Sequence, residues 1–152
     1  MAILDIVKYP NEILAAKARD LTDNEILTSE VQTLIEDMID TCHHHNGLGL
    51  AACQVGSDAN VCIYKDKVYK AIINPKIIAR MGKMTVRDEA CLSISDQSFT
   101  VKRSKQIIVR GLDRDGEGIN IKTSNKLMSK ILQHEVDHLN GITLADKGKR
   151  TE

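Results

Sequence analysis

The stretch His134-Glu135-Val136-Asp137-His138 constrains this chain more than any other feature, because it combines two metal-binding side chains with a carboxylate. Residues four positions apart lie on one face of a helix, so His134 and His138 can reach one cation. Glu135 then lies beside an adjacent coordination position. The pattern predicts a helix with a metal site and hydrolytic chemistry; the alternative is a pair of surface histidines on an exposed helix.

A catalytic zinc or iron site of this kind needs a third protein ligand and leaves one position for water. After His138 the only carboxylates are Asp146 and Glu152, and no second helix long enough to return a ligand is apparent. Leu144 occupies the position where a longer form of the motif has a third histidine. We therefore expect the third ligand to come from upstream.

Cys91 is the best upstream candidate, because it lies between a turn-like stretch at 80–83 and a strand-like stretch, where a thiolate is held rigidly. The other cysteines follow the apolar periodicity of helices or strands and are typical of small buried hydrophobic residues. The histidine run falls in the last turn of a predicted helix and is interpreted as a solvated helix end. The weaker candidates for the third metal ligand are therefore the cysteines Cys42, Cys53 and Cys62 and the histidine run His43-His44-His45.

Three motifs occur in order along the chain: Gly47-Leu48-Gly49-Leu50-Ala51-Ala52-Cys53-Gln54, Glu89-Ala90-Cys91-Leu92-Ser93 and Gln133-His134-Glu135-Val136-Asp137-His138-Leu139. With Tyr9-Pro10 near the start, they make the chain resemble the peptide deformylase family over nearly its whole length. The resemblance implies a bacterial type of enzyme, a metal-dependent hydrolase that removes the N-formyl group from the formyl-methionyl end of nascent polypeptides and releases formate.

The resemblance also implies roles for particular residues. Cys91, His134 and His138 would hold one divalent ion per chain, commonly Fe²⁺ in the family, with Zn²⁺, Ni²⁺ or Co²⁺ as alternatives. Glu135 would handle the proton. The side chain of Gln54 and the backbone N–H of Leu92 would bind the oxyanion. These assignments agree with general chemistry, since a bound cation lowers the pKa of a water to ~7 and a neutral amide donates to a developing oxyanion.

Further residues are expected to contact the substrate. The two glycines of the first motif lack Cβ atoms and permit an extended peptide backbone to approach closely. Positions along the metal helix and beside the second motif line the side-chain pocket in the family. The predicted substrate-binding set is Gly47, Leu48, Gly49, Arg87, Glu89, Ala90, Leu127, Lys130 and Ile131.

Five positions depart from the family pattern. Ala90 replaces a glycine and Ser95 a proline, whereas Arg87 and Lys130 replace apolar residues. At a fifth position, Ser98 replaces an arginine that many members carry, which removes one possible contact to the peptide. Either the two cations extend to solvent or the pocket accepts something other than methionine. Two other functions therefore stay open: a catalytically weak paralogue that binds formylated or other N-blocked peptides with altered specificity, and a generic zinc endopeptidase.

Composition indicates a single domain over residues 1–152. The 21 basic and 21 acidic residues balance, so we expect no sequence-specific nucleic-acid binding and no membrane association. No signal peptide or long apolar run is present, which predicts a cytoplasmic protein with reduced cysteines. We expect a monomer that meets its formylated peptides at the ribosome. Aromatic residues make up only 3%, so the core is expected to be aliphatic.

Helix and strand signals favour an α+β fold, with mostly antiparallel or mixed sheets packed around a C-terminal helix that carries the metal motif. One helix is predicted from a capping box at Ser29 to Asn46-Gly47, and another from near Ser124 to Asn140-Gly141. The predicted strands are Val61–Tyr64, Tyr69–Ile73, Pro75–Ala79, Gln106–Arg110 and Ile119–Lys122.

Overall fold

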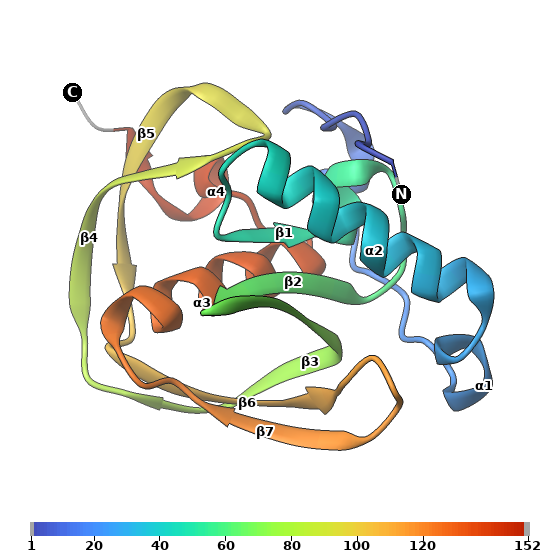
Figure 1. Ribbon diagram of the computed structural model, residues 1–152. Helices are drawn as coiled ribbons and strands as arrows, with labels where there is room; N and C mark the ends of the chain where they lie inside the picture. The colour runs from blue at the N-terminus through green and yellow to red at the C-terminus, as the bar shows by residue number, and fades with distance from the viewer. Residues whose placement is uncertain (1, 151–152) are drawn as a thin grey trace.

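The computed structural model describes residues 2–150 of the chain, and Figure 1 shows how its helices and strands are arranged. Two sheets and a long C-terminal helix make up most of the fold. The elements, with η for a 3₁₀ helix, are η1 (Glu12–Ala15), α1 (Asp23–Ile26), α2 (Ser29–His44), β1 (Gly49–Ala51), η2 (Ala52–Val55), β2 (Val61–Asp66), β3 (Val68–Met81), β4 (Met84–Cys91), β5 (Ile94–Arg103), β6 (Gln106–Leu112), β7 (Gly118–Lys122), α3 (Lys126–Leu139), α4 (Leu144–Lys147) and β8 (Lys149–Arg150).

Helix α2 is capped by Thr28 rather than by the predicted Ser29. The Thr28 hydroxyl accepts a hydrogen bond from the backbone N–H of Val31, so Ser29 becomes the first helical residue. Adjacent hydroxyl residues offered two possible caps, and the sequence pattern alone did not separate them. The end of the helix is as predicted, since Asn46 takes a φ of 55° immediately before Gly47.

Helix α3 agrees with its prediction at both ends. It begins after Asn125, whose side chain accepts a hydrogen bond from the N–H of Met128 at 2.8 Å. It ends at Leu139 with Asn140 as its C-cap, and Gly141 follows with a φ of 77°. A Cβ atom at Gly141 would also lie 2.7 Å from the carbonyl oxygen of Ala15, so the chain approaches its own N-terminal segment too closely for a side chain.

Within residues 2–150 the strands form a five-stranded sheet, in the order β1-β2-β3-β6-β7, and a three-stranded sheet, in the order β4-β5-β8. Neighbouring strands pair antiparallel in both sheets. The prediction of an α+β fold with mostly antiparallel sheets is therefore confirmed.

Two predicted strands, at 69–73 and 75–79, are in fact the single strand β3. The register against β6 shifts around Asn74, which has a φ of 52°. The side chain of Asn74 stabilises this irregularity, because it accepts a hydrogen bond from the N–H of Leu21 and donates one to the Leu21 carbonyl, each at 2.9 Å. An Asn-Pro pair is a typical turn signal, which explains why the strand was divided.

Strands β4 and β5 were not among the predicted ranges. Charged residues interrupt the apolar alternation of β4, and a bulge at Asp88, with a φ of 57°, changes its period. The strands β1 and β8 also lay outside the predictions, because three and two residues are too few for a periodicity.

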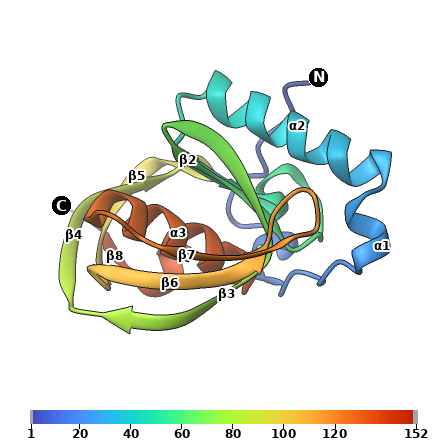
Figure 2. The ribbon, with the colours of Figure 1, turned by 60° about the horizontal axis from the view of Figure 1, so that its bottom comes forward.

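Helix α3 lies at the centre of the fold, as Figures 1 and 2 show. All of its residues from Ile131 to Leu139 are buried. One aliphatic cluster joins α3 to the sheet through residues such as Leu132 and Ile107, and a second joins α2 to the opposite face through residues such as Ile35 and Ile63. The position of the metal motif is thus determined by the core. None of the helices within residues 2–150 is long and apolar enough to span a lipid bilayer.

Candidate active site

The three predicted metal ligands come together although they belong to two different elements. Cys91 ends β4, whereas His134 and His138 lie one turn apart on α3. Their ligand atoms all lie within 4.8 Å of one another. The two Nε2 atoms are 3.2 Å apart, and Cys91 Sγ lies 3.3 Å from His138 Nε2.

These distances fit a single cation. Tetrahedral bonds of about 2.1 Å to nitrogen and about 2.3 Å to sulfur place the ligand atoms roughly 3.4 to 3.6 Å apart. All three side chains are buried, and their facing lone pairs favour a positive charge between them. The residues present therefore match a mononuclear site with two nitrogen ligands and one sulfur ligand.

Glu89 orients the first histidine. Its Oε2 lies 2.8 Å from His134 Nδ1. A carboxylate only accepts hydrogen bonds, so Nδ1 carries the proton and Nε2 is left free for the cation. Burial raises the pKa of Glu89, but hydrogen bonds from His134 and Arg103 outweigh it and lower the pKa to about 2. Glu89 was expected to contact the substrate; its carboxylate instead holds the ring of His134.

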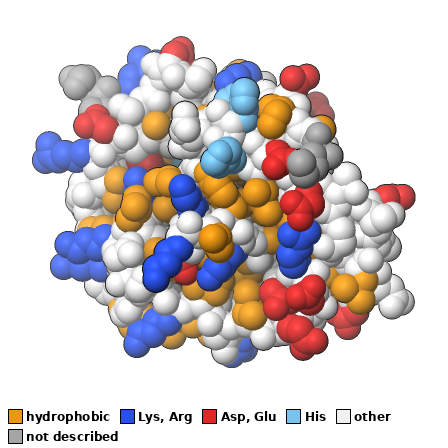
Figure 3. All heavy atoms as spheres, viewed as in Figure 1, with side chains coloured by type: hydrophobic (Ala, Val, Ile, Leu, Met, Phe, Trp, Pro, Cys, Tyr) orange, Lys and Arg blue, Asp and Glu red, His pale blue; other side chains and the backbone are white. Residues whose placement is uncertain are grey.

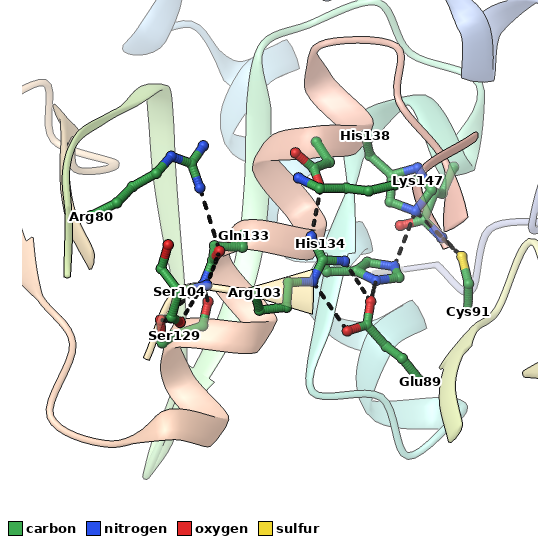
Figure 4. Close-up of polar contacts among 12 residues, drawn as sticks. Arg80, Glu89, Cys91, Arg103, Ser104, Ser129, Gln133, His134, His138 and Lys147 are labelled. Carbon is green, nitrogen blue, oxygen red and sulfur yellow. Dashed lines mark hydrogen bonds and ion pairs between the residues drawn. The ribbon is translucent and has the colours of Figure 1, made fainter. Parts of the chain in front are cut away.

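Arg103 holds Glu89 in turn, as Figure 4 shows. Its Nε and terminal nitrogen donate to the two Glu89 oxygens at 3.2 and 2.5 Å. A second terminal nitrogen donates to Asp137 Oδ2 at 2.6 Å, and Lys147 Nζ donates to the same oxygen at 3.0 Å. Neither Arg103 nor Asp137 was among the predicted site residues, although with Glu89 they connect β4, β5 and α3 behind the three clustered ligand atoms.

Glu135 lies beside the cluster with one oxygen unsatisfied. Its Oε1 is buried and has no hydrogen-bond partner in the described part of the chain. Burial raises the pKa of this carboxyl group to about 7, although the neighbouring His134 lowers it. A Cβ atom at Gly49 would lie 2.5 Å from Glu135 Oε2, so only glycine leaves room for the carboxylate against β1.

Gln54 presents its NH₂ group to the metal cluster. Its Oε1 accepts a hydrogen bond from the N–H of Ala51 at 3.0 Å, which fixes the orientation of the amide. The NH₂ group therefore faces Cys91 Sγ at 3.6 Å and Ser93 Oγ at 3.2 Å. A buried donor is thus held next to the position of a cation, in the place expected for an oxyanion contact.

Comparison with known proteins decides the family. A family model described as "Polypeptide deformylase" matches residues 3–152. The chain belongs to the peptide deformylase family. A peptide deformylase from Thermodesulfovibrio yellowstonii is 39% identical over 153 residues, which cover 97% of this chain and 90% of the relative.

Solved deformylase structures have the same fold. A peptide deformylase from Legionella pneumophila is 34% identical, with a TM-score of 0.89 and coverage of 96% of this chain and 86% of the other. A class I type b enzyme from Acinetobacter baumannii, solved with Met-Ala-Ser bound, is 28% identical, with a TM-score of 0.89 and coverage of 96% and 98%. The predicted activity, metal-dependent hydrolytic deformylation of nascent peptides, is confirmed, and the weak binding paralogue is not supported.

A cavity of about 450 Å³ opens beside the metal cluster of this deformylase. Figure 3 shows hydrophobic side chains gathered near the centre of that face, below the exposed histidines, with Lys and Arg side chains among them. The lining residues are His45, Asn46, Gly47, Leu48, Gly49, Gln54, Asp88, Glu89, Ala90, Cys91, Leu92, Ser95, Lys130, Ile131, His134 and Glu135.

Two residues that were predicted to contact the deformylase substrate do not line this cavity. Leu127 lies in the first turn of α3, beyond the cavity, and is 50% exposed. Arg87 is exposed because the bulge at Asp88 changes the alternation of β4, and Asp88 lines the cavity instead. The remaining predicted substrate residues all lie in the cavity wall.

Ala90 causes no backbone strain in the ligand loop. The left-handed residue of this segment is Asp88, and Ala90 lies in β4 opposite Ser98. A glycine is therefore not required at position 90 of this deformylase for conformational reasons. The additional methyl group lies in the cavity wall, so its effect is on the substrate space and not on the metal ligand.

The remaining cysteines are buried and the histidine run is exposed, as the sequence predicted for small core residues and for a solvated helix end. Cys42, Cys53 and Cys62 are buried, and burial raises the pKa of Cys42 and of Cys53 to about 12. None of the three joins the cluster of ligand atoms within residues 2–150, and all three pack in the hydrophobic core as small apolar side chains. The run His43-His44-His45 is exposed at the end of α2, and His45 also lines the cavity.

Proposed function

We propose that this deformylase places the formyl group of its substrate at the Cys91–His134–His138 cluster, with Glu135 as the carrier of protons. One observation carries the proposal: a buried carboxyl group with an unsatisfied oxygen, and a pKa of about 7, lies beside three metal-ligating atoms in the wall of a cavity. Such a group accepts a proton from the attacking water and returns it to the leaving amine at neutral pH.

Gln54 and Leu92 are proposed to stabilise the oxyanion. The NH₂ group of Gln54 is held in one orientation by Ala51, and a neutral donor of this kind is typically worth about 3 kcal/mol. The backbone N–H of Leu92 follows the ligand Cys91 directly in the cavity wall. The extended peptide backbone is proposed to run along the edge strand β1, where Gly47 and Gly49 permit close approach.

A divalent ion bound by this cluster supplies Lewis acidity and lowers the pKa of a water to ~7. We propose Fe²⁺ as the ion of the cell, since one thiolate and two imidazoles suit iron; Zn²⁺, Ni²⁺ and Co²⁺ fit the same donors. We further propose a monomer acting on nascent chains at the ribosome, in the cytoplasm.

Formate release tests the proposal directly. Protein purified without oxygen and loaded separately with Fe²⁺, Zn²⁺, Ni²⁺ or Co²⁺ is assayed on formyl-Met and other formyl dipeptides, with metal content measured for each sample. We expect formate from every loaded form, and rapid loss of activity in air for the iron form but not the nickel form. Absence of formate from fully loaded protein would refute the mechanism, whereas equal stability in air would exclude iron as the basis of activity.

Cys91→Ser is expected to weaken metal binding more than tenfold, because an alcohol at its ordinary pKa does not replace a thiolate ligand. Cys62→Ser is the matched control, since Cys62 is also buried but lies in β2 away from the cluster. Metal content after dialysis against a graded chelator series provides the measurement. Full occupancy in the Cys91 variant would remove Cys91 from the ligand set.

Lys130→Ile is expected to raise kcat/KM for formyl-Met dipeptides roughly tenfold to a hundredfold, the size of about 1–3 kcal/mol of apolar contact. Lys130 is half-buried in the cavity wall, and it has no ion pair in the described part of the chain. Lys126→Ile, at an exposed position in the first turn of the same helix, is the control. Equal kcat/KM in parent and Lys130 variant would mean that the ammonium group extends into solvent and does not affect the bound side chain.

A further inference from the structure

A second cavity, of about 420 Å³, lies where the turn between β3 and β4 meets the turn between β5 and β6. The two turns are in contact, because a Cβ atom at Gly82 would lie 3.2 Å from the side chain of Lys105. None of the residues that line this second cavity lines the first. The second wall consists of Arg80, Lys83, Met84, Thr85, Lys102, Arg103, Ser104, Gln133 and Lys147, and contains no acidic residue.

The positive charge of this wall is only partly compensated. Arg103 and Lys147 are neutralised by Glu89 and Asp137, two cations against two carboxylates. Arg80, Lys83 and Lys102 remain, and within residues 2–150 none of the three has an ion pair. The chain as a whole has equal numbers of acidic and basic residues, but the segments 67–87 and 97–112 contain no Asp or Glu. The wall of the second cavity is therefore locally positive, although the net charge of the chain is zero.

The wall is built into the fold and is not a chance meeting of flexible side chains. Gln133 is 1% exposed, and its Oε1 accepts hydrogen bonds from the Ser104 N–H at 2.9 Å and from Arg80 at 3.4 Å. Its NH₂ group donates to the Ser104 carbonyl at 2.8 Å and to Ser129 Oγ at 2.9 Å. Figure 4 shows Arg80 directed towards Gln133 in this network. Arg80, Lys83 and Lys102 are themselves exposed, and the hydrogen bond to Gln133 directs the Arg80 guanidinium group towards the cavity.

We propose that this cavity binds a phosphate group. A phosphate carries up to two negative charges and several acceptor oxygens, which match three uncompensated cations better than a single carboxylate does. The fork of Arg80 can bind two phosphate oxygens, Lys83 and Lys102 supply point charges, and the hydroxyl groups of Thr85 and Ser104 add neutral donors. The phosphate is either a free anion or part of an RNA backbone. Phosphate binding here does not rest on the deformylation mechanism proposed above, although Arg103 borders this cavity and also holds Glu89.

Binding is measured by amide chemical-shift titration of the zinc-loaded enzyme, first with sodium phosphate at constant ionic strength and then with a short single-stranded RNA. We expect saturable shifts at Thr85 and Ser104. The double variant Lys83→Gln/Lys102→Gln is expected to weaken binding at least about tenfold, because it removes two of the three uncompensated cations of the wall. The control Lys76→Gln/Lys122→Gln removes the same charge from exposed positions on β3 and β7 and is expected to bind like the parent.

The two arms separate the sources of phosphate. If inorganic phosphate saturates the site and RNA does not bind, the ligand is a small free anion. If RNA binds more tightly than phosphate and its affinity falls steeply with salt, the ligand is a phosphate of the RNA backbone. Formate release is expected to stay unchanged in both double variants, because none of the four lysines lies in the active-site wall. No binding in either arm, or equal binding by the Lys83/Lys102 variant and the control, would overturn the proposal.

Discussion

Glu135→Gln is expected to retain its metal while kcat for formyl-Met peptides falls by ~10²-fold or more, since general acid–base catalysis contributes roughly 10²–10⁴. The amide preserves the shape of the side chain, so it still fits the space that Gly49 leaves beside β1. It removes the carboxyl group that is proposed to accept and return the proton. Because the loss concerns the transition state, KM is expected to change little.

The measurement combines metal analysis with steady-state kinetics on the same preparation of the Glu135 variant. Glu117→Gln, an exposed carboxylate in the turn between β6 and β7, is the control for loss of one negative charge. Loss of metal together with activity would show that Glu135 is itself a ligand. Full activity with full metal would assign the proton transfers to another group.

Arg103→Met is expected to destabilise the protein by about 3–5 kcal/mol, because removal of one member of a buried ion pair leaves the others uncompensated. The side chain of Arg103 is 1% exposed, and that of Glu89 is 2% exposed. Methionine retains much of the apolar volume but leaves Glu89 without its guanidinium partner and Asp137 with Lys147 alone. Urea unfolding of parent and variant, both metal-free, measures the difference.

Arg110→Met is the matched control, because Arg110 lies exposed on β6 and contacts Asn120 only at 3.3 Å. It is expected to change the free energy of unfolding by less than about 1 kcal/mol. In the Arg103 variant we also expect metal affinity to fall roughly tenfold to a hundredfold, since Glu89 no longer holds the ring of His134 firmly. Unchanged stability would mean that the two carboxylates become protonated at little cost.

The sequence was most informative where chemistry demands particular residues at a particular spacing. Two histidines one turn apart specify a helix and a cation, and the helix caps at Asn125 and Asn140 are local signals, so α3 was predicted closely. Cys91 was identified among four cysteines because the other three follow apolar periodicities; those three are buried, and their thiols are not among the clustered ligand atoms within residues 2–150.

The failures arose where tertiary contacts override local pattern. A bulge in β4 brings Asp88 and not Arg87 to the cavity. The alternation of apolar and polar residues does not predict where a strand contains a bulge. Arg103 carried a usable signal that was not recognised. Phe99, Val101 and Arg103 alternate along β5, and all three are buried, so an arginine stood in the inward register of an otherwise apolar strand. Its partners Glu89 and Asp137 are distant in sequence and became apparent only from the fold.

Helix α3 is buried from Ile131 to Leu139, and that same stretch contains two of the clustered candidate ligands and Glu135, the proposed proton carrier. Residues that build the core therefore alternate with residues that perform the chemistry, and neither set can move without displacing the other. New substrate preferences can arise with least damage on the cavity wall outside this stretch. The departures at Ala90, Ser95 and Lys130 all lie there, so this fold lets specificity diverge while the reaction itself stays fixed.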